Sequence, residues 1–160
     1  MLLRDYQINV INQVEAAIAE GARSLLVGLF TGAGKTVIFC ELANRITGRT
    51  LIIAPLRELV WQAASKVREI VEVDPAIEMS EFRSQEDEWW SPQIVVACKQ
   101  TLVRGRYKKF ADISLVIVDE AHISYSPACL EMLRWFQDRG ACVVGFTATP
   151  FRMDGEAMVA

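Results

Sequence analysis

Residues 24–36 read SLLVGLFTGAGKT, and this stretch indicates how the rest of the chain is expected to fold. Ser24 to Leu29 is a short apolar run typical of a buried strand, and a helical segment, Lys35 to Ile46, follows. A glycine-rich turn, TGAGKT at 31–36, separates the two. Glycines let backbone N–H groups turn onto phosphate oxygens, and the helix N-terminus adds its positive dipole end. The stretch therefore predicts a strand, a phosphate-binding loop and a helix.

The loop departs from the general phosphate-loop motif at one position, because Leu29 stands where the motif has a glycine, five residues before Gly34. In this interpretation Lys35 reaches the β and γ phosphates of ATP, and the Thr36 hydroxyl ligates Mg²⁺. The alternative is a flexible glycine turn that binds nothing. The expected nucleotide-binding residues of the loop are Thr31, Gly32, Ala33, Gly34, Lys35 and Thr36.

An acidic pair follows another predicted strand, Leu115 to Val118. In an open parallel sheet, ligands bind at the carboxyl edge, where Asp119 and Glu120 would lie. Asp119 there can hold Mg²⁺ opposite Thr36, and Glu120 can polarise the water that attacks the γ phosphate. Taken alone, the pair could instead cap the next helix. We expect Lys35, Asp119 and Glu120 to be the catalytic residues.

Short apolar runs alternate with helical periodicity along the whole chain. Helices are expected over 4–20 and 56–71 and near 99–104 and 127–138. Further strands are predicted at 50–54, 94–97 and 142–146, and the acidic segment 74–91 is expected to be an irregular surface excursion with room for a short strand. Continuously apolar strands between helices indicate a mostly parallel sheet with helices on both faces. The sequence thus predicts one α/β domain over residues 1–160.

Composition narrows the class of protein. The chain has 160 residues, of which 52% are hydrophobic, so it can bury a core without disulfides or metals. No apolar run is long enough to span a bilayer, and we expect a cytoplasmic protein without membrane association. A net charge of −3 argues against nucleic-acid binding by a globally basic surface. The four widely spaced cysteines indicate free, mostly buried thiols rather than disulfides or a zinc site.

The chain resembles superfamily 2 helicases of the DEAD/DEAH-box kind, and six motifs carry the resemblance in the family's order. Cys98 stands in the fourth of them where a threonine is more usual. The motifs are LLRDYQ at 2–7, LFTGAGKT at 29–36, APLRELV at 54–60, VACKQTL at 96–102, DEAH at 119–122 and TATP at 147–150. The resemblance implies the first, ATP-binding RecA-like domain of a helicase or translocase, with ATP and Mg²⁺ as cofactors.

The resemblance also implies roles for individual residues. Gln7 of the first motif reads the adenine edge, and Arg4 belongs to the same ATP-binding motif. Residues of the third and fourth motifs contact the sugar–phosphate backbone of nucleic acid, namely Pro55, Leu56, Arg57 and Thr101. Three further residues couple the nucleotide state to the grip on the strand, namely His122, Thr147 and Thr149.

Three of these residues also have a plainer interpretation. Arg57 could be a solvated helix residue paired with Glu58 or Glu41. Thr147 and Thr149 could belong to a turn that Pro150 ends. Other features stay open between binding and structure: Tyr6 beside adenine or within the first helix, Trp89 and Trp90 as base-stacking or packing residues, and Arg104, Arg106, Lys108 and Lys109 as phosphate contacts or a solvated loop.

The run 147–155, with Arg152 and Asp154 after the proline, resembles the branch that holds type III restriction subunits and excision-repair helicases. That branch favours DNA over RNA as the partner. It also implies a second RecA-like domain in cis, absent from this chain, that supplies an arginine to the γ phosphate. We therefore expect this chain alone to hydrolyse ATP slowly or not at all. The alternative is a stand-alone protein that binds ATP or nucleic acid and regulates a partner motor.

Overall fold

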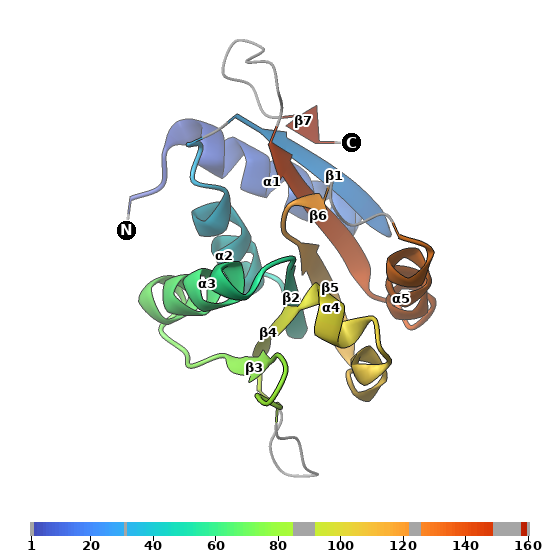
Figure 1. Ribbon diagram of the computed structural model, residues 1–160. Helices are drawn as coiled ribbons and strands as arrows, with labels where there is room; N and C mark the ends of the chain where they lie inside the picture. Colours follow the sequence, from blue (N-terminus) through green and yellow to red (C-terminus); the bar gives the residue numbers. More distant parts are fainter. Residues whose placement is uncertain (1, 31, 85–91, 122–125, 149–157, 160) are drawn as a thin grey trace.

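The strands form one sheet in the order β3-β4-β2-β5-β6-β1-β7 (Figure 1). The computed structural model describes residues 2–30, 32–84, 92–121 and 126–148, together with the backbone of 158–159. Neighbouring strands from β3 to β1 pair in parallel, and β7 pairs with β1 in the antiparallel sense. The strands are β1 (Ser24–Leu29), β2 (Arg49–Ala54), β3 (Ala76–Glu78), β4 (Ile94–Cys98), β5 (Ile113–Val118), β6 (Cys142–Ala148) and β7 (Met158–Val159).

Helices cover both faces of the sheet and enclose two separate cores. Helices α1 (Asp5–Ala19), α2 (Lys35–Arg45) and α3 (Arg57–Ile70) pack on one face. Helix α4 (Lys99–Leu102), the 3-10 helix η1 (Arg106–Lys109) and helix α5 (Pro127–Asp138) pack on the other. Figure 1 shows α2 and α3 on the opposite side of the strands from α4 and α5. The predicted α/β fold, a mostly parallel sheet with helices on both faces, is confirmed.

The two cores explain why the strands have continuous apolar sequences. In β2, Ile52 and Ala54 join the core under α1–α3, whereas Leu51 and Ile53 join the core under α4 and α5. Side chains of a strand alternate between faces, so a strand covered on both faces is apolar at most of its positions. All residues of β2 are buried, including Arg49 at its start.

Expected and observed elements differ mainly at their ends. β1 has the predicted bounds, and α2 ends at Arg45 because Ile46 adopts an extended backbone conformation. Two short elements were not expected: β7, at the edge beside β1, and η1, in the basic stretch after α4. The short strand within 74–91 is β3, and the residues after 84 in that segment lie outside the described part of the chain.

Among the described residues, no helix is both long and apolar enough to cross a membrane.

The four cysteines are free and buried, as predicted. Burial raises the pKa of the Cys40 thiol to about 12 and also raises the pKa of Cys129 and Cys142. Because the thiolate is the reactive species, native thiols should resist a disulfide reagent such as DTNB at pH 8. We expect no rapid reaction in the folded chain and four reactive thiols in guanidinium. A thiol that reacts within seconds in the native protein would contradict the burial.

Candidate functional site

The candidate residues follow strands that all end at the same edge of the sheet. In a parallel sheet the carboxyl ends lie together, and loops that leave them can build a common site. The glycine-rich loop follows β1, and Asp119 and Glu120 follow β5. Strand β6 lies between β1 and β5, so the two segments face each other across one strand. Pro55 follows β2, the other neighbour of β5.

Lys35 links the glycine-rich loop to the acidic pair. Its Nζ lies 2.8 Å from Asp119 Oδ1 and also forms an ion pair with Glu120 Oε1. Asp119 is buried, and two hydrogen bonds hold it in place, one from its backbone and one to its side chain. Its N–H donates to Ile53 O at 2.8 Å, and its Oδ1 accepts from the Glu120 N–H at 2.9 Å. The structure thus brings together the three residues that the sequence predicted to be catalytic.

The ion pairs determine the charge state of Lys35. Burial has the largest single influence on the pKa of its ammonium and would lower it. Hydrogen bonds and attraction from Asp119 and Glu120 together outweigh the burial, so the pKa is raised above its ordinary value. Lys35 is therefore a full cation at neutral pH, which suits binding of a polyphosphate.

Glu120 adopts a backbone conformation that is unusual for a residue with a side chain. Its φ of 51° lies in the left-handed region. Such conformations are costly and concentrate at functional sites, where surrounding structure enforces them. Here the enforcing contacts are the ion pair with Lys35 and the hydrogen bond to Asp119. From this conformation the Glu120 carboxylate contacts Lys35 at the end of the glycine-rich loop.

The donor set fits Mg²⁺. Thr36 directly follows Lys35 as the second residue of α2, and it is half-buried. Mg²⁺ prefers hard oxygen ligands and is commonly held by one or two carboxylates together with substrate phosphates. Asp119, a buried carboxylate beside Lys35, supplies such an oxygen. A metal-bound nucleotide would give Lys35 phosphate oxygens to pair with in addition to the carboxylates.

The N-terminal segment packs directly on the glycine-rich loop. Tyr6 Oη and Gln7 Nε2 both donate to Ala33 O, at 2.5 and 3.0 Å. Gln7 Oε1 accepts from the Arg4 N–H at 2.9 Å, so the amide bridges the start of α1 and the loop. A primary amide offers a second N–H and a second acceptor lone pair, which remain for an adenine edge. The predicted adenine contact of Gln7 stays a prediction.

A hollow of about 250 Å³ lies at this junction. It joins exposed residues at the start of the chain to the glycine-rich loop, and Gln7 forms part of its wall. Its position matches the expected place of the nucleoside, next to the loop expected to bind the phosphates. Its lining residues are Leu2, Arg4, Gln7, Gly32, Ala33, Gly34 and Val37.

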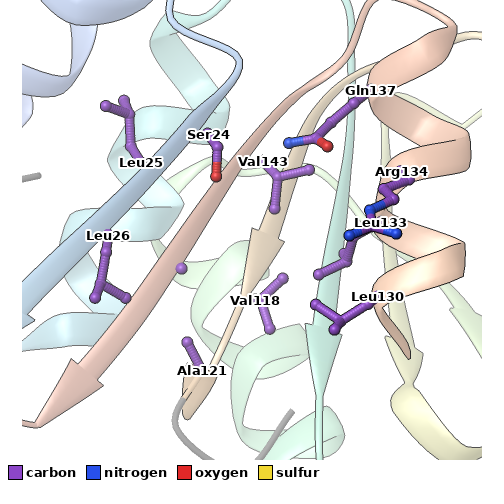
Figure 2. A pocket seen from close by; sticks show the side chains of 11 residues that line it. Ser24, Leu25, Leu26, Val118, Ala121, Leu130, Leu133, Arg134, Gln137 and Val143 are labelled. Carbon is purple, nitrogen blue, oxygen red and sulfur yellow. The ribbon is translucent and has the colours of Figure 1, made fainter. Parts of the chain in front are cut away.

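A second hollow, also of about 250 Å³, lies on the opposite face, between α5 and strands β6 and β1 (Figure 2). Leu130 and Leu133 of α5 face Val118 across it. At its end, Ala121 follows the acidic pair and packs over Gly145 of β6, where a Cβ would approach the Ala121 Cβ to 2.9 Å. The missing side chain at Gly145 therefore lets the segment after β5 lie close to the sheet.

The predicted strand-contacting residues lie farther along the same edge. Leu56 and Arg57 at the start of α3 are exposed, whereas Pro55 is buried. Arg57 pairs with Glu81, at 3.1 Å between Nη2 and Oε1, rather than with Glu58 or Glu41. Sequence alone contains no signal for this partner, which lies 24 positions away. Thr101 in α4 accepts a hydrogen bond from the Ser80 N–H at 3.2 Å, so both predicted contacts touch the turn after β3.

The basic stretch after α4 has a structural function that the sequence did not reveal. Arg106 and Lys109 form ion pairs with the fully buried Glu78, at 2.9 and 2.7 Å. The ion pairs are a role that neither alternative included, and phosphate contact by this stretch stays a prediction: Arg106 is half-buried, whereas Lys109 remains exposed. A buried carboxylate without partners would cost several kcal/mol, and the two cations remove that penalty. Arg104 and Lys108 remain exposed.

Thr147 lies in β6 beside Gly28 of β1, three positions before the glycine-rich loop of residues 31–36 begins. It is thus close to the nucleotide-binding segment in the sheet, as a coupling residue needs to be. Several predicted residues lie outside the described part of the chain, namely Thr31, Trp89, Trp90, His122, Thr149, Pro150, Arg152 and Asp154.

Taken together, the parallel sheet, the glycine-rich loop after β1 and the paired carboxylates after β5 define a P-loop nucleotide-binding domain. A family model described as type III restriction enzyme, res subunit, matches residues 1–152, and the chain belongs to this family. The resemblance to superfamily 2 helicases is thereby confirmed.

Relatives and solved structures agree with this family. IRC3 of Saccharomyces cerevisiae, named as an ATP-dependent helicase, is 32% identical over 98% of this chain and 25% of its own length. The DNA 3'-5' translocase XPB2 of Sulfurisphaera tokodaii is 30% identical over 96% of this chain and 32% of its own length. The helicase domain of Pyrococcus furiosus Hef is 26% identical, with a TM-score of 0.68 over 96% of this chain and 36% of that one. The UvsW helicase of bacteriophage T4, 22% identical with a TM-score of 0.69 over 98% of this chain and 55% of that one, shares the fold.

The chain spans about a quarter to a third of the length of IRC3 and XPB2. The likeness therefore concerns the helicase-type motor domain that holds the nucleotide loop.

Two glycines of the loop provide a matched test of the contact with Gln7. Both have positive φ, but a Cβ at Gly34 would lie 2.6 Å from Gln7 Nε2, whereas one at Gly32 meets nothing within 4 Å. We expect Gly32→Ala to lower the free energy of unfolding by about 1–2 kcal/mol through backbone strain. Gly34→Ala should cost roughly 1 kcal/mol more, because Gln7 must give up its bond to Ala33.

Urea unfolding of both variants measures this difference. Adding Gln7→Ala to each variant should abolish it, since the clash then has no partner. Equal losses of stability in the two single variants would show that Gln7 does not pack on the loop as described.

Proposed function

We propose that this chain is the ATP-binding motor domain of a helicase or translocase that couples Mg²⁺-dependent ATP hydrolysis to movement on nucleic acid. The observation that carries the proposal is the meeting of Lys35 with Asp119 and Glu120 at the carboxyl edge of the sheet. Family membership supports the same assignment, because the relatives named above are described as helicases or a translocase. A role as a stand-alone regulator gains no support from them.

In the proposed reaction, Lys35 releases the carboxylates in part and pairs with the β and γ phosphates. Asp119 and Thr36 would hold Mg²⁺, which would neutralise the charge that develops on the phosphates. Glu120 orients the attacking water and accepts its proton. Its carboxylate contacts the Lys35 ammonium, which is proposed to bind the γ phosphate, so it lies near the reacting group.

Nucleic acid is proposed to pass along the neighbouring part of the edge. Arg57 pairs with a phosphate, Thr101 donates its hydroxyl proton to another, and Pro55 and Leu56 shape the surface. DNA is favoured over RNA, since XPB2 is named as a DNA translocase and mph1 of Neurospora crassa, 28% identical over 92% of this chain and 14% of its own length, as a DNA helicase.

Coupling is proposed to run from the γ phosphate to the strand through His122, Thr147 and Thr149. Closure around ATP is proposed to need a second RecA-like domain in cis, whose arginine contacts the γ phosphate and can accelerate hydrolysis by roughly 10³ to 10⁵. The greater length of IRC3 and XPB2 is consistent with that requirement. A cytoplasmic location belongs to the same proposal.

Lys35→Ala tests the nucleotide site. The substitution removes the cation and leaves two carboxylates facing the phosphates, so ATP affinity should fall about tenfold or more. Titration with a fluorescent ATP analogue measures the affinity, and circular dichroism checks the fold. Lys66→Ala serves as the matched control, because Lys66 is an exposed lysine paired with Glu69 on α3. Equal affinity in the wild-type chain and Lys35→Ala would refute the site.

Glu120→Gln tests the proton-accepting residue. Glutamine keeps the shape of the side chain but accepts a proton poorly, so hydrolysis in the complete motor should fall about 100-fold or more. ATP affinity should stay within a few-fold, and bound ATP should persist long enough to be isolated with the protein. Glu69→Gln is the control for loss of a paired, exposed carboxylate. Unimpaired turnover in Glu120→Gln would exclude Glu120 from this role.

A further inference from the structure

We propose that Trp61 and Phe82 form a base-stacking site for single-stranded nucleic acid, with Arg57 taking the phosphate of the stacked nucleotide. The inference rests on the proposed function and specifies where on the edge the strand is held. Trp61 lies one helical turn after Arg57 in α3, and Phe82 lies in the turn after β3. The turn after β3 would thus be a third contact segment, next to those after β2 and β4.

The two rings form an exposed aromatic pair. Their centroids are 5.1 Å apart and their planes are perpendicular, and each side chain is 38% exposed. Leu56, at 55% exposure, precedes α3 on the same segment. Three of the six exposed large apolar side chains among the described residues therefore belong to α3, its N-cap and the facing turn. Such a gathering of exposed apolar surface on a folded domain indicates a binding function.

The turn that carries Phe82 is held rigidly. Met79 and Phe82 exchange two backbone hydrogen bonds, at 2.7 and 2.8 Å. Arg106 donates to the carbonyl oxygens of Ser80 and Phe82, at 2.7 and 2.9 Å. The same guanidinium is held in place by the buried Glu78. An exposed aromatic ring on a buried ionic anchor is preorganised, so little conformational entropy is lost when a ligand stacks on it.

The charges beside the rings suit a nucleotide. The Arg57 guanidinium carbon lies 5.9 Å from the centre of the Phe82 ring, so one group can take a phosphate while the ring takes the attached base. Arg57 now pairs with Glu81, and both side chains are about half exposed or more. Exposed ion pairs contribute little stability, so a phosphate can replace Glu81 readily.

The same turn also touches the second phosphate contact. Thr101 Oγ1 accepts the Ser80 N–H, which leaves its own O–H free to orient toward a phosphate. Two phosphate contacts and the aromatic pair are therefore joined by one short segment, residues 79–82. Stacking on aromatic rings tolerates any base, as a motor that moves along a strand requires.

The test compares Phe82→Leu with the wild-type chain on two labelled oligonucleotides of equal length, oligo(dT) and an abasic strand with the same phosphates. Leucine keeps apolar packing against Trp61 but removes the aromatic face. Fluorescence anisotropy at low salt should show about five- to tenfold weaker binding of oligo(dT) and unchanged binding of the abasic strand. Phe82→Tyr should restore affinity. Leu26→Ala should have no effect, because Leu26 is also exposed, at 39%, but lies on β1.

Arg57→Ala separates this inference from the function on which it rests, because it should weaken the binding of both oligonucleotides, oligo(dT) and the abasic one. If Phe82→Leu weakened the binding of both oligonucleotides equally, or of neither, the stacking site would be overturned. Weaker binding of both oligonucleotides by Arg57→Ala would in that case still support the proposed path of nucleic acid along the edge. No binding of either strand by the wild-type chain would overturn both. Oligo(rU) in place of oligo(dT) should show the same loss in Phe82→Leu, and the ratio of the two affinities reports the preference for DNA or RNA.

Discussion

The ion pairs of Lys35 with Asp119 and Glu120 join segments that are 85 positions apart in the chain for Lys35 and Glu120. These ion pairs connect segments that follow β1 and β5, which β6 separates in the sheet. They place the lysine proposed to bind phosphates next to the carboxylates proposed to bind the metal and the attacking water. The contact needs both strands to run parallel and to end together, which the buried apolar sheet enforces. Glu120 makes its contact from a left-handed backbone conformation, which is costly and persists where surrounding contacts enforce it.

Most of the fold could be predicted because each element has a local signal. The run from Ser24 to Leu29 is apolar throughout and bounded by turn residues, and it forms a strand with those bounds. The order of strands in the sheet and the presence of β7 have no local signal. Likewise, η1 forms where Arg106 and Lys109 meet Glu78, a contact between positions about 30 apart that no periodicity reveals.

The nucleotide site could be predicted better than the strand contacts, for a physical reason. Phosphate binding requires glycines and a lysine at fixed spacing, so Gly34 and Lys35 are visible in the sequence. Strand contacts depend on tertiary partners instead. The plainer interpretation of Arg57 paired it with Glu58 or Glu41, yet its partner is Glu81, on a turn that Arg106 links to the buried Glu78. In the sequence Glu78 is one of several acidic residues in its segment, and nothing there indicates that it is buried.

The neutralisation of Glu78 has a consequence for how the domain would sense ionic strength. Each cation that contacts a phosphate releases condensed counterions, and the logarithm of affinity then falls with the logarithm of salt in proportion to their number. Arg106 and Lys109 are already paired with Glu78, so they contribute fewer released counterions than unpaired cations would. Binding at this part of the edge would therefore respond less to salt than the number of basic residues in the stretch 104–109 suggests, and it would depend more on ring contacts and neutral donors.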